Sequence, residues 1–137
     1  MSEWNGSPLF QFAEFVLASG KKSKFKLECD AISPEEWHSL GRIVRPILPP
    51  YGRVVSVPRG GDAWASILEH YRVPGEHRVL IVDDVWTTGI SMGLVVNRTM
   101  IHTPINEDFL WHGVVLFARG PVPKNVTALF HLNENLQ

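Results

Sequence analysis

Two adjacent carboxylates followed by a turn rich in hydroxyl groups form the most chemically informative stretch of the sequence. Asp83 and Asp84 come directly after the apolar run Val79–Val82, and the segment Thr87–Ser91, which reads Thr-Thr-Gly-Ile-Ser, follows them. Carboxylates accept hydrogen bonds from sugar hydroxyls or approach a phosphate-bound Mg²⁺, which prefers oxygen ligands. Hydroxyls and unhindered N–H groups at a helix start favour a phosphate. The stretch therefore predicts a site for a sugar phosphate.

A second glycine-rich junction lies earlier in the chain. The apolar run Val54–Val57 leads into Pro58 and then Arg59-Gly60-Gly61. Two glycines after a strand let backbone amides gather around an anion. Arg59 adds a positive charge that can bind the anion in a bidentate manner. A tight turn into the next helix is the plainer explanation for Pro58 alone. For Arg59, Gly60 and Gly61 we expect an anion site, because they precede the acidic pair in consecutive strand–turn units.

The elements that position these residues predict an α/β fold. Val79–Val82 is apolar throughout and is bounded upstream by Pro74-Gly75, which is typical of a buried strand of a parallel sheet. A ligand should lie at its carboxyl end, where we expect the two acids to leave the strand. Strands that alternate with helices imply a parallel sheet with right-handed crossovers. The expected strands are Val54–Val57, Val79–Val82, Val114–Phe117 and about Ala128–His131, and two expected helices cover Asp62–Tyr71 and about Ser91–Ile101.

A further helix should begin after Ser33. Ser33-Pro34-Glu35-Glu36 combines an N-cap, a proline at the first helical position and a glutamate three residues after the cap. Pro46 and Pro49-Pro50 should end this helix. Its apolar stripe is expected to consist of Trp37, Leu40, Val44 and Ile47, and that of the next helix of Trp64, Ile67, Leu68 and Tyr71.

The N-terminal region predicts a hairpin. Glu14–Leu27 contains a Ser19-Gly20 turn between two apolar or mixed runs. Four lysines add a local cationic patch, which is either a solvated hairpin face or a partner for pyrophosphate or a carboxylate. These lysines are Lys21, Lys22, Lys24 and Lys26.

Length and composition favour one small domain. The 137 residues can bury one core, and we assign residues 1–137 to a single domain whose N-terminal part, at about 8–32, precedes a core at about 33–137. A net charge of −1 gives no basic field for nucleic acid, so we expect small-molecule partners. Cys29 is the sole cysteine and the six histidines lack metal-ligand spacing.

No apolar run approaches the roughly 20 residues that span a bilayer, so no membrane partner is expected. Met1–Gly6 lacks the basic start and apolar core of a signal peptide. A cytoplasmic location is therefore expected.

The segment Val79–Ser91 closely resembles the phosphoribosyl pyrophosphate (PRPP) binding motif of type I phosphoribosyltransferases. It has four apolar residues, two acidic residues and then Thr-Thr-Gly-x-Ser. Response regulators also place an acidic pair after an apolar strand, but near the chain start and with a phosphoacceptor Asp downstream. Here the only aspartate after Asp84 is Asp108, which lies in an expected polar loop. The resemblance implies a type I phosphoribosyltransferase-like parallel sheet flanked by helices, with a small N-terminal hood.

A second segment, Phe12–Phe25, resembles the Phe-Gly-x-Phe-x-Leu-x-Ser-Gly-x-x-Ser stretch that opens orotate phosphoribosyltransferases and forms part of the hood over the base. Ala18 stands where those enzymes usually carry lysine, and Lys26-Leu27 stand where they carry two aromatics. Orotate is therefore one candidate among the possible bases.

The resemblance implies Mg²⁺-dependent transfer of the phosphoribosyl group from PRPP to a nitrogenous base such as orotate, by a homodimer. Asp83 and Asp84 would hold the ribose hydroxyls and help to place the metal through ribose or water. Arg59, Gly60 and Gly61 would bind the pyrophosphate. The 5-phosphate would be held by Thr87, Thr88, Gly89, Ile90 and Ser91.

The base would meet Arg119 and Lys26. Arg119 follows the run His112–Ala118, near the place of a carboxylate-binding arginine in orotate enzymes, and an arginine fork suits a carboxylate. An arginine that caps loop carbonyls before Pro121 is an equal alternative.

One feature of the family is missing from the sequence. Only Asp62–Val82 separates Gly61 from Asp83, and the expected helix, turn and strand use up this interval. Catalytic family members have a further strand and a long mobile loop here, and the loop closes over PRPP. Loop closure commonly completes a catalytic site and excludes water. The alternatives are therefore a non-catalytic PRPP or nucleotide-binding regulatory module, or a dimer in which the partner supplies the missing groups.

Overall fold

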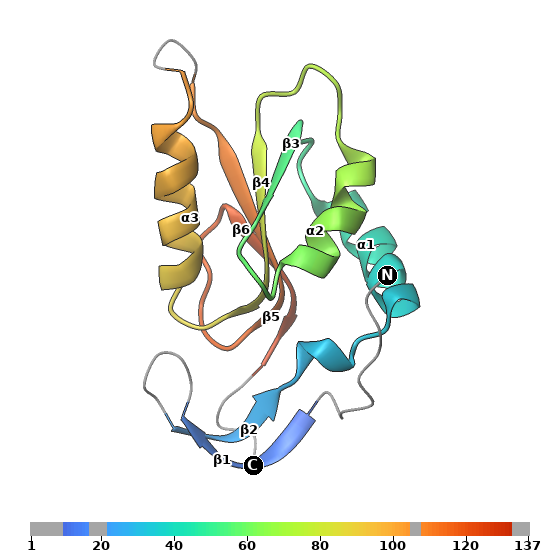
Figure 1. Cartoon of the computed structure of the whole chain (residues 1–137), viewed down its shortest axis with the longest axis vertical. Helices are drawn as coiled ribbons and strands as arrows, with labels where there is room; N and C mark the ends of the chain where they lie inside the picture. The colour runs from blue at the N-terminus through green and yellow to red at the C-terminus, as the bar shows by residue number, and fades with distance from the viewer. Residues whose placement is uncertain (1–9, 17–21, 105–107, 133–137) are drawn as a thin grey trace.

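The computed structural model describes residues 10–16, 22–104 and 108–132, with side chains from residue 28 onward within these ranges. A four-stranded parallel sheet has the order β3-β4-β5-β6, and a separate antiparallel pair is formed by β1 and β2. Figure 1 shows this pair beyond the end of the large sheet at which β4 turns into α3. The strands are β1 Phe10–Val16, β2 Lys22–Leu27, β3 Arg53–Ser56, β4 Val79–Trp86, β5 Trp111–Ala118 and β6 Val126–His131. The α-helices are α1 Pro34–Val44, α2 Asp62–Leu68 and α3 Ile90–Ile101.

Helices cover both faces of the parallel sheet, which confirms the predicted α/β fold class. On one face, Trp64 of α2 packs in the same buried cluster as Leu80 and Val82 of β4. On the other face, Val95 of α3 packs with Ile81. Figure 1 shows α1 and α2 together on one side of the sheet and α3 on the opposite side. Because alternate residues of a strand point to opposite faces, the continuous apolar run of β4 is needed to bury it on both sides.

α1 begins with the predicted capping box. Ser33 Oγ accepts the Glu36 N–H at 3.2 Å, and the Ser33 N–H donates to Glu36 Oε1 at 2.9 Å. Trp37 and Val44 are buried as predicted, but Ile47 is 57% exposed, so the prediction that it continues the apolar stripe is wrong. The helix ends at Val44 and a 3₁₀ turn follows. Its tighter repeat moves Ile47 out of line with the stripe.

Several element boundaries differ from the sequence-based expectation; β5, expected at Val114–Phe117, already begins at Trp111, and the differences in β4 and α2 bear on the site. β4 continues through Asp83 and Asp84 to Trp86, so the prediction that the acids leave the strand is wrong. The strand is longer because β5 offers partners beyond Val82, up to the pair Trp86 and Ala118. The helix expected over Asp62–Tyr71 is α-helical only to Leu68 and ends in a 3₁₀ turn.

The interval between the two candidate anion sites is short. After α2 and its 3₁₀ turn, a link through Pro74 and Gly75 leads directly into β4. All residues of Asp62–Val82 are described, and they form no additional strand and no long loop. The missing family loop is therefore missing from the fold as well.

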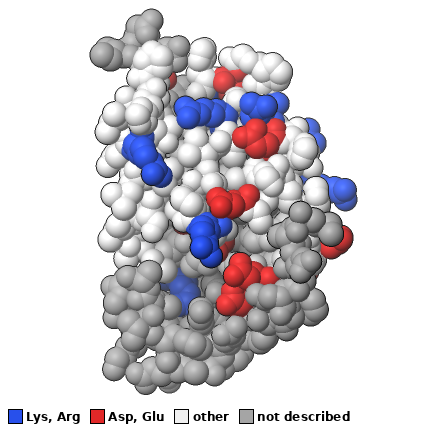
Figure 2. All heavy atoms as spheres, in the orientation of Figure 1, with Lys and Arg blue, Asp and Glu red and all other residues white. Residues whose placement is uncertain are grey.

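The N-terminal hairpin is present as predicted. β1 and β2 pair antiparallel, with Phe12 opposite Phe25. The predicted Ser19-Gly20 turn lies outside the described residues, as do the side chains of both strands. Figure 2 shows basic and acidic side chains intermixed on the displayed face of the molecule. Within the described residues, no helix has the length and hydrophobicity to cross a bilayer.

Candidate functional site

The acidic pair lies at the carboxyl half of β4, with one acid on each face of the sheet. Asp83 is 9% exposed and lines a small hollow on the α3 side. Asp84 is half-buried and faces the other side, where a side chain at Gly60 would come within 2.5 Å of both of its carboxylate oxygens. Consecutive strand residues point to opposite faces, which explains the split. The two acids therefore lie on opposite faces of one strand end.

The carboxylates also fix their own backbone. Asp83 Oδ1 accepts the N–H of Asp84 at 2.8 Å, and Asp84 Oδ1 accepts the N–H of Val85 at 2.7 Å. Burial raises the pKa of Asp83 well above the usual carboxyl range, the Asp84 carboxyl raises it further, and the Asp84 N–H only partly opposes them. The neutral form of Asp83 is thus favoured in the free protein, and a nearby cation or hydroxyl donors would favour the charged form.

The turn after β4 has the geometry of an anion site. Gly89 has φ +84°, a left-handed conformation that favours glycine, and it is the N-cap of α3. The 12-residue α3 presents its unpaired N–H groups and positive dipole end here. A hollow of about 20 Å³ lies at this point. It is lined by Asp83, Trp86, Thr87, Gly89, Ile90 and Ser91, among others.

The second candidate anion loop follows β3. The Gly61 N–H donates to Val57 O at 2.9 Å, and Ser56 Oγ donates to Asp62 Oδ1 at 2.6 Å. The Val57 N–H donates to Val82 O at 2.7 Å, which ties the loop to β4. Arg59 is exposed, and the peptide bond between Pro58 and Arg59 is cis. The loop is therefore anchored at both ends while its arginine remains accessible.

Adjacent parallel strands bring the predicted site residues to one edge. Ser56 pairs with Val82, so the loop after β3 meets the acidic end of β4. Arg119 comes from the end of β5, and its N–H donates to Trp86 O at 2.8 Å. Arg119 is 8% exposed. Lys26 lies in β2 opposite Gln11, but its side chain is outside the described part.

The structure adds two residues that the sequence analysis did not select. Trp86 lines the hollow, and its indole N–H donates to Pro121 O at 3.1 Å. Burial and then Asp84 raise the pKa of the Cys29 thiol well above its usual range, and a side-chain hydrogen bond joins the thiol to Asp84. The only sequence signal for Trp86 was a large aromatic inside the motif. Cys29 gave none, because its contact with Asp84 depends on the fold.

The two carboxylates are compatible with a metal ion that binds together with a phosphorylated substrate. Among the described residues, no three His, Cys, Asp or Glu side chains gather as a metal site. Asp83 and Asp84 face different sides of β4, so they do not form a cage. Mg²⁺ commonly binds one or two carboxylates together with substrate phosphates and water. The donor set therefore fits Mg²⁺ held mainly by a phosphorylated ligand.

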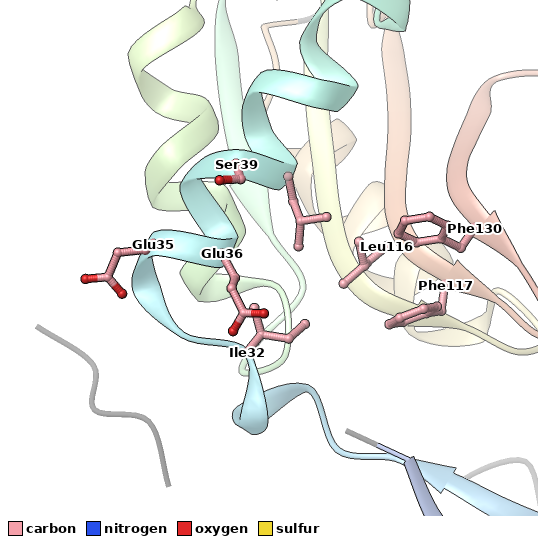
Figure 3. Close-up of a pocket in the computed structure, with 8 residues that line it drawn as sticks. Ile32, Glu35, Glu36, Ser39, Leu116, Phe117 and Phe130 are labelled. Atoms are coloured by element: carbon pink, nitrogen blue, oxygen red, sulfur yellow. The ribbon is translucent and has the colours of Figure 1, made fainter. Parts of the chain in front are cut away.

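A larger cavity, of about 370 Å³, lies between α1 and the last two strands. Figure 3 shows Leu116, Phe117 and Phe130 on the strand side and Ile32 and Glu36 on the side of α1. Neither the acids nor either anion loop lines it. The sequence-predicted site is therefore a separate, shallower feature at the strand ends.

Solved structures share this fold. Orotate phosphoribosyltransferase from Aeropyrum pernix is similar with a TM-score of 0.69 and 19% identity, over 90% of this chain and 88% of that chain. The orotate phosphoribosyltransferase of Mycobacterium tuberculosis H37Rv, in complex with Fe(III) dicitrate, has a TM-score of 0.65 and 14% identity, over 90% of this chain and 89% of that chain. Leishmania donovani UMP synthase gives 0.66 and 18%, over 92% of this chain and 34% of that chain. No protein-family model and no curated protein matches the sequence. The likeness confirms the predicted type I phosphoribosyltransferase-like fold.

Proposed function

We propose that this chain, which has the fold of orotate phosphoribosyltransferases, binds PRPP or a nucleotide 5-phosphate and transfers phosphoribosyl to a nitrogenous base such as orotate. One observation carries the proposal: two anion loops flank an acidic pair at a single sheet edge. PRPP has phosphate groups at both ends and a ribose diol between them, and this order matches the order of the two loops and the acidic pair. The solved neighbours with this fold include orotate phosphoribosyltransferases from two organisms.

Each group has a distinct role in the proposed complex. The turn Thr87–Ser91 would hold the 5-phosphate, and Arg59-Gly60-Gly61 would hold the pyrophosphate. Asp83 and Asp84 would accept hydrogen bonds from the ribose hydroxyls. In the reaction, the bond from the anomeric carbon to the pyrophosphate oxygen breaks, and a bond to the base nitrogen forms. Mg²⁺ bound with the substrate would neutralise charge on the leaving pyrophosphate. The protein contributes positioning and electrostatic stabilisation.

The base side rests on fewer residues. Arg119 follows β5 at the same edge, and a guanidinium fork would suit a base with a carboxylate, such as orotate. Lys26 is the second candidate. Arg119→Lys keeps the charge and removes the fork, so it should weaken a carboxylated base more than PRPP. Equal losses for both ligands would favour the alternative role of Arg119 as a structural cap. We also propose a homodimer, which light scattering after size exclusion would test.

A second function is favoured by the short interval Asp62–Val82. Because it forms no loop that could close over PRPP, a site that binds without turnover would serve as a PRPP or nucleotide sensor. Incubation with PRPP, Mg²⁺ and a panel of bases, while pyrophosphate release is followed, separates the two functions. Release that depends on one base supports transfer. Calorimetric binding of PRPP without release supports the sensor, and absence of binding contradicts both.

A further inference from the structure

We propose that Trp86 is a positioning residue that locks the turn Thr87–Gly89 to the segment Arg119–Pro121, so that the two form one preorganised unit. The inference rests on the proposed function, because it assigns the phosphate turn a support that the sequence motif does not specify. The side chain of Trp86 lies between two segments that are far apart in the sequence. Both segments follow neighbouring strands, β4 and β5.

The indole packs directly against the phosphate turn. A Cβ atom at Gly89 would collide with the six-membered ring of Trp86, so the ring fills the space beside this residue. Gly89 also has φ +84°, and both conditions demand glycine. Trp86 lines the same hollow as Asp83 and Thr87. The ring is therefore one wall of the candidate phosphate site.

The same residue holds the segment after β5 by its side chain and its backbone. The indole N–H donates to Pro121 O at 3.1 Å, and Trp86 O accepts the Arg119 N–H at 2.8 Å. A Cβ atom at Gly120 would lie 3.3 Å from Thr87 O, so the two segments are also in close backbone approach. A displacement of either segment would break contacts with the other.

This arrangement reduces the conformational entropy that the turn loses when a ligand binds. A turn that is already held in its binding shape loses less conformational freedom when a phosphate arrives, and the difference appears as affinity. The indole supplies two separable parts of the lock: the ring against Gly89 and the N–H to Pro121. Substitutions that remove one part or both should therefore weaken phosphate binding in steps.

Three variants measure these steps by calorimetric titration with ribose 5-phosphate and with inorganic phosphate. Trp86→Phe keeps a ring against Gly89 and removes the N–H, and we expect about threefold weaker binding. Trp86→Leu removes both parts, and we expect a loss of about tenfold or more. Trp111→Phe is the matched control, because Trp111 is half-buried at the opposite end of β5, and it should bind like the wild type. Unchanged affinity in folded Trp86→Leu would overturn the inference.

Amide hydrogen exchange supplies a readout without ligand. In Trp86→Phe, exchange should accelerate together at Thr87–Gly89 and at Arg119–Gly120, while the centre of α3 keeps its wild-type protection. Acceleration in only one segment, or along the whole chain, would overturn the lock. If the wild type binds and Trp86→Leu binds equally well, this inference alone fails. If the wild type binds neither ligand, the proposed function fails, and the role of Trp86 in binding fails with it.

Discussion

At the scale of single residues, the burial of Asp83 makes the charged form of its carboxyl unfavourable for the stability of the folded protein. Its pKa is raised mainly by burial and then by Asp84. A carboxyl whose pKa is higher in the folded than in the unfolded protein favours folding at low pH, and this contribution is lost as the pH rises to the raised pKa. The free energy of unfolding should therefore decline as the pH rises above the usual range of carboxyl pKa values.

Asp83→Asn should remove this decline. The amide keeps an oxygen for the Asp84 N–H and carries no charge, so we expect a gain of at least about 1 kcal/mol in unfolding free energy at neutral pH. Urea unfolding across pH values from 5 to about 8 measures it. Asp108→Asn is the control, because Asp108 is exposed and should leave the pH dependence unchanged. A variant that is no more stable than the wild type at neutral pH contradicts the assigned cause.

The acids should also separate ligands by their chemistry. Asp84→Asn, like Asp83→Asn, should weaken the binding of PRPP with Mg²⁺ by about tenfold or more, because in the proposed complex the acids bind ribose and metal. Inorganic phosphate lacks both a diol and a leaving group, so its affinity should hardly change. Parallel calorimetric titrations compare the two ligands. Equal losses would remove the acids from the ribose and metal roles.

At the scale of elements, the contact of the β3–α2 loop with β4 decides the shape of the proposed pyrophosphate site. Gly60 leaves no room for a side chain, since a Cβ atom would lie 2.5 Å from the Asp84 carboxylate oxygens. Asp84 or the loop must move to admit a methyl group. The glycine is therefore required by packing between two elements, in addition to any anion.

Gly60→Ala should lower PRPP affinity by about tenfold, as the loop and Asp84 separate. Gly93→Ala is a matched control, because a Cβ atom there meets nothing within 4 Å. Gly93 lies within α3, where alanine should stabilise the helix by about 0.5 to 1 kcal/mol. Thermal unfolding and titration with PRPP measure both variants. Full affinity in Gly60→Ala would show that the loop tolerates the displacement.

At the scale of the whole molecule, the proposed site has two candidate anion loops, and the described interval between them contains no segment that could cover it. Binding by a preformed phosphate turn is largely equal in the ground and transition states, so it lowers the dissociation constant without lowering the barrier. The interval Asp62–Val82 is occupied by α2, a short link and β4. Exclusion of water from the leaving pyrophosphate would need another part of the chain or a partner copy.

We therefore expect PRPP to bind with turnover below the ordinary range of roughly 1 to 10³ per second. Pyrophosphate release with each base in turn measures it. Turnover within that range would contradict the sensor function. Lys21→Ala with Lys22→Ala would then show whether the lysine-rich hairpin replaces the loop.

The sequence by itself determined the order of the main elements and the position of the candidate phosphate turn at the start of a helix. Val79–Val82 and the turn at Gly89 act through near neighbours, so an apolar strand, a turn and a helix start follow from adjacent residues. The capping box at Ser33 was readable for the same reason. The Ser19-Gly20 signal between two apolar or mixed runs likewise predicted the β1–β2 hairpin.

Only the tertiary structure decided which groups meet. β4 runs on through the acids because β5 pairs with it as far as Trp86. Asp83 is buried and Asp84 lies against Gly60 because different elements cover the two faces of the sheet. The contacts of Cys29 with Asp84 and of Trp86 with Pro121 join distant segments. Such contacts depend on strand order and packing, which no local pattern of residues encodes.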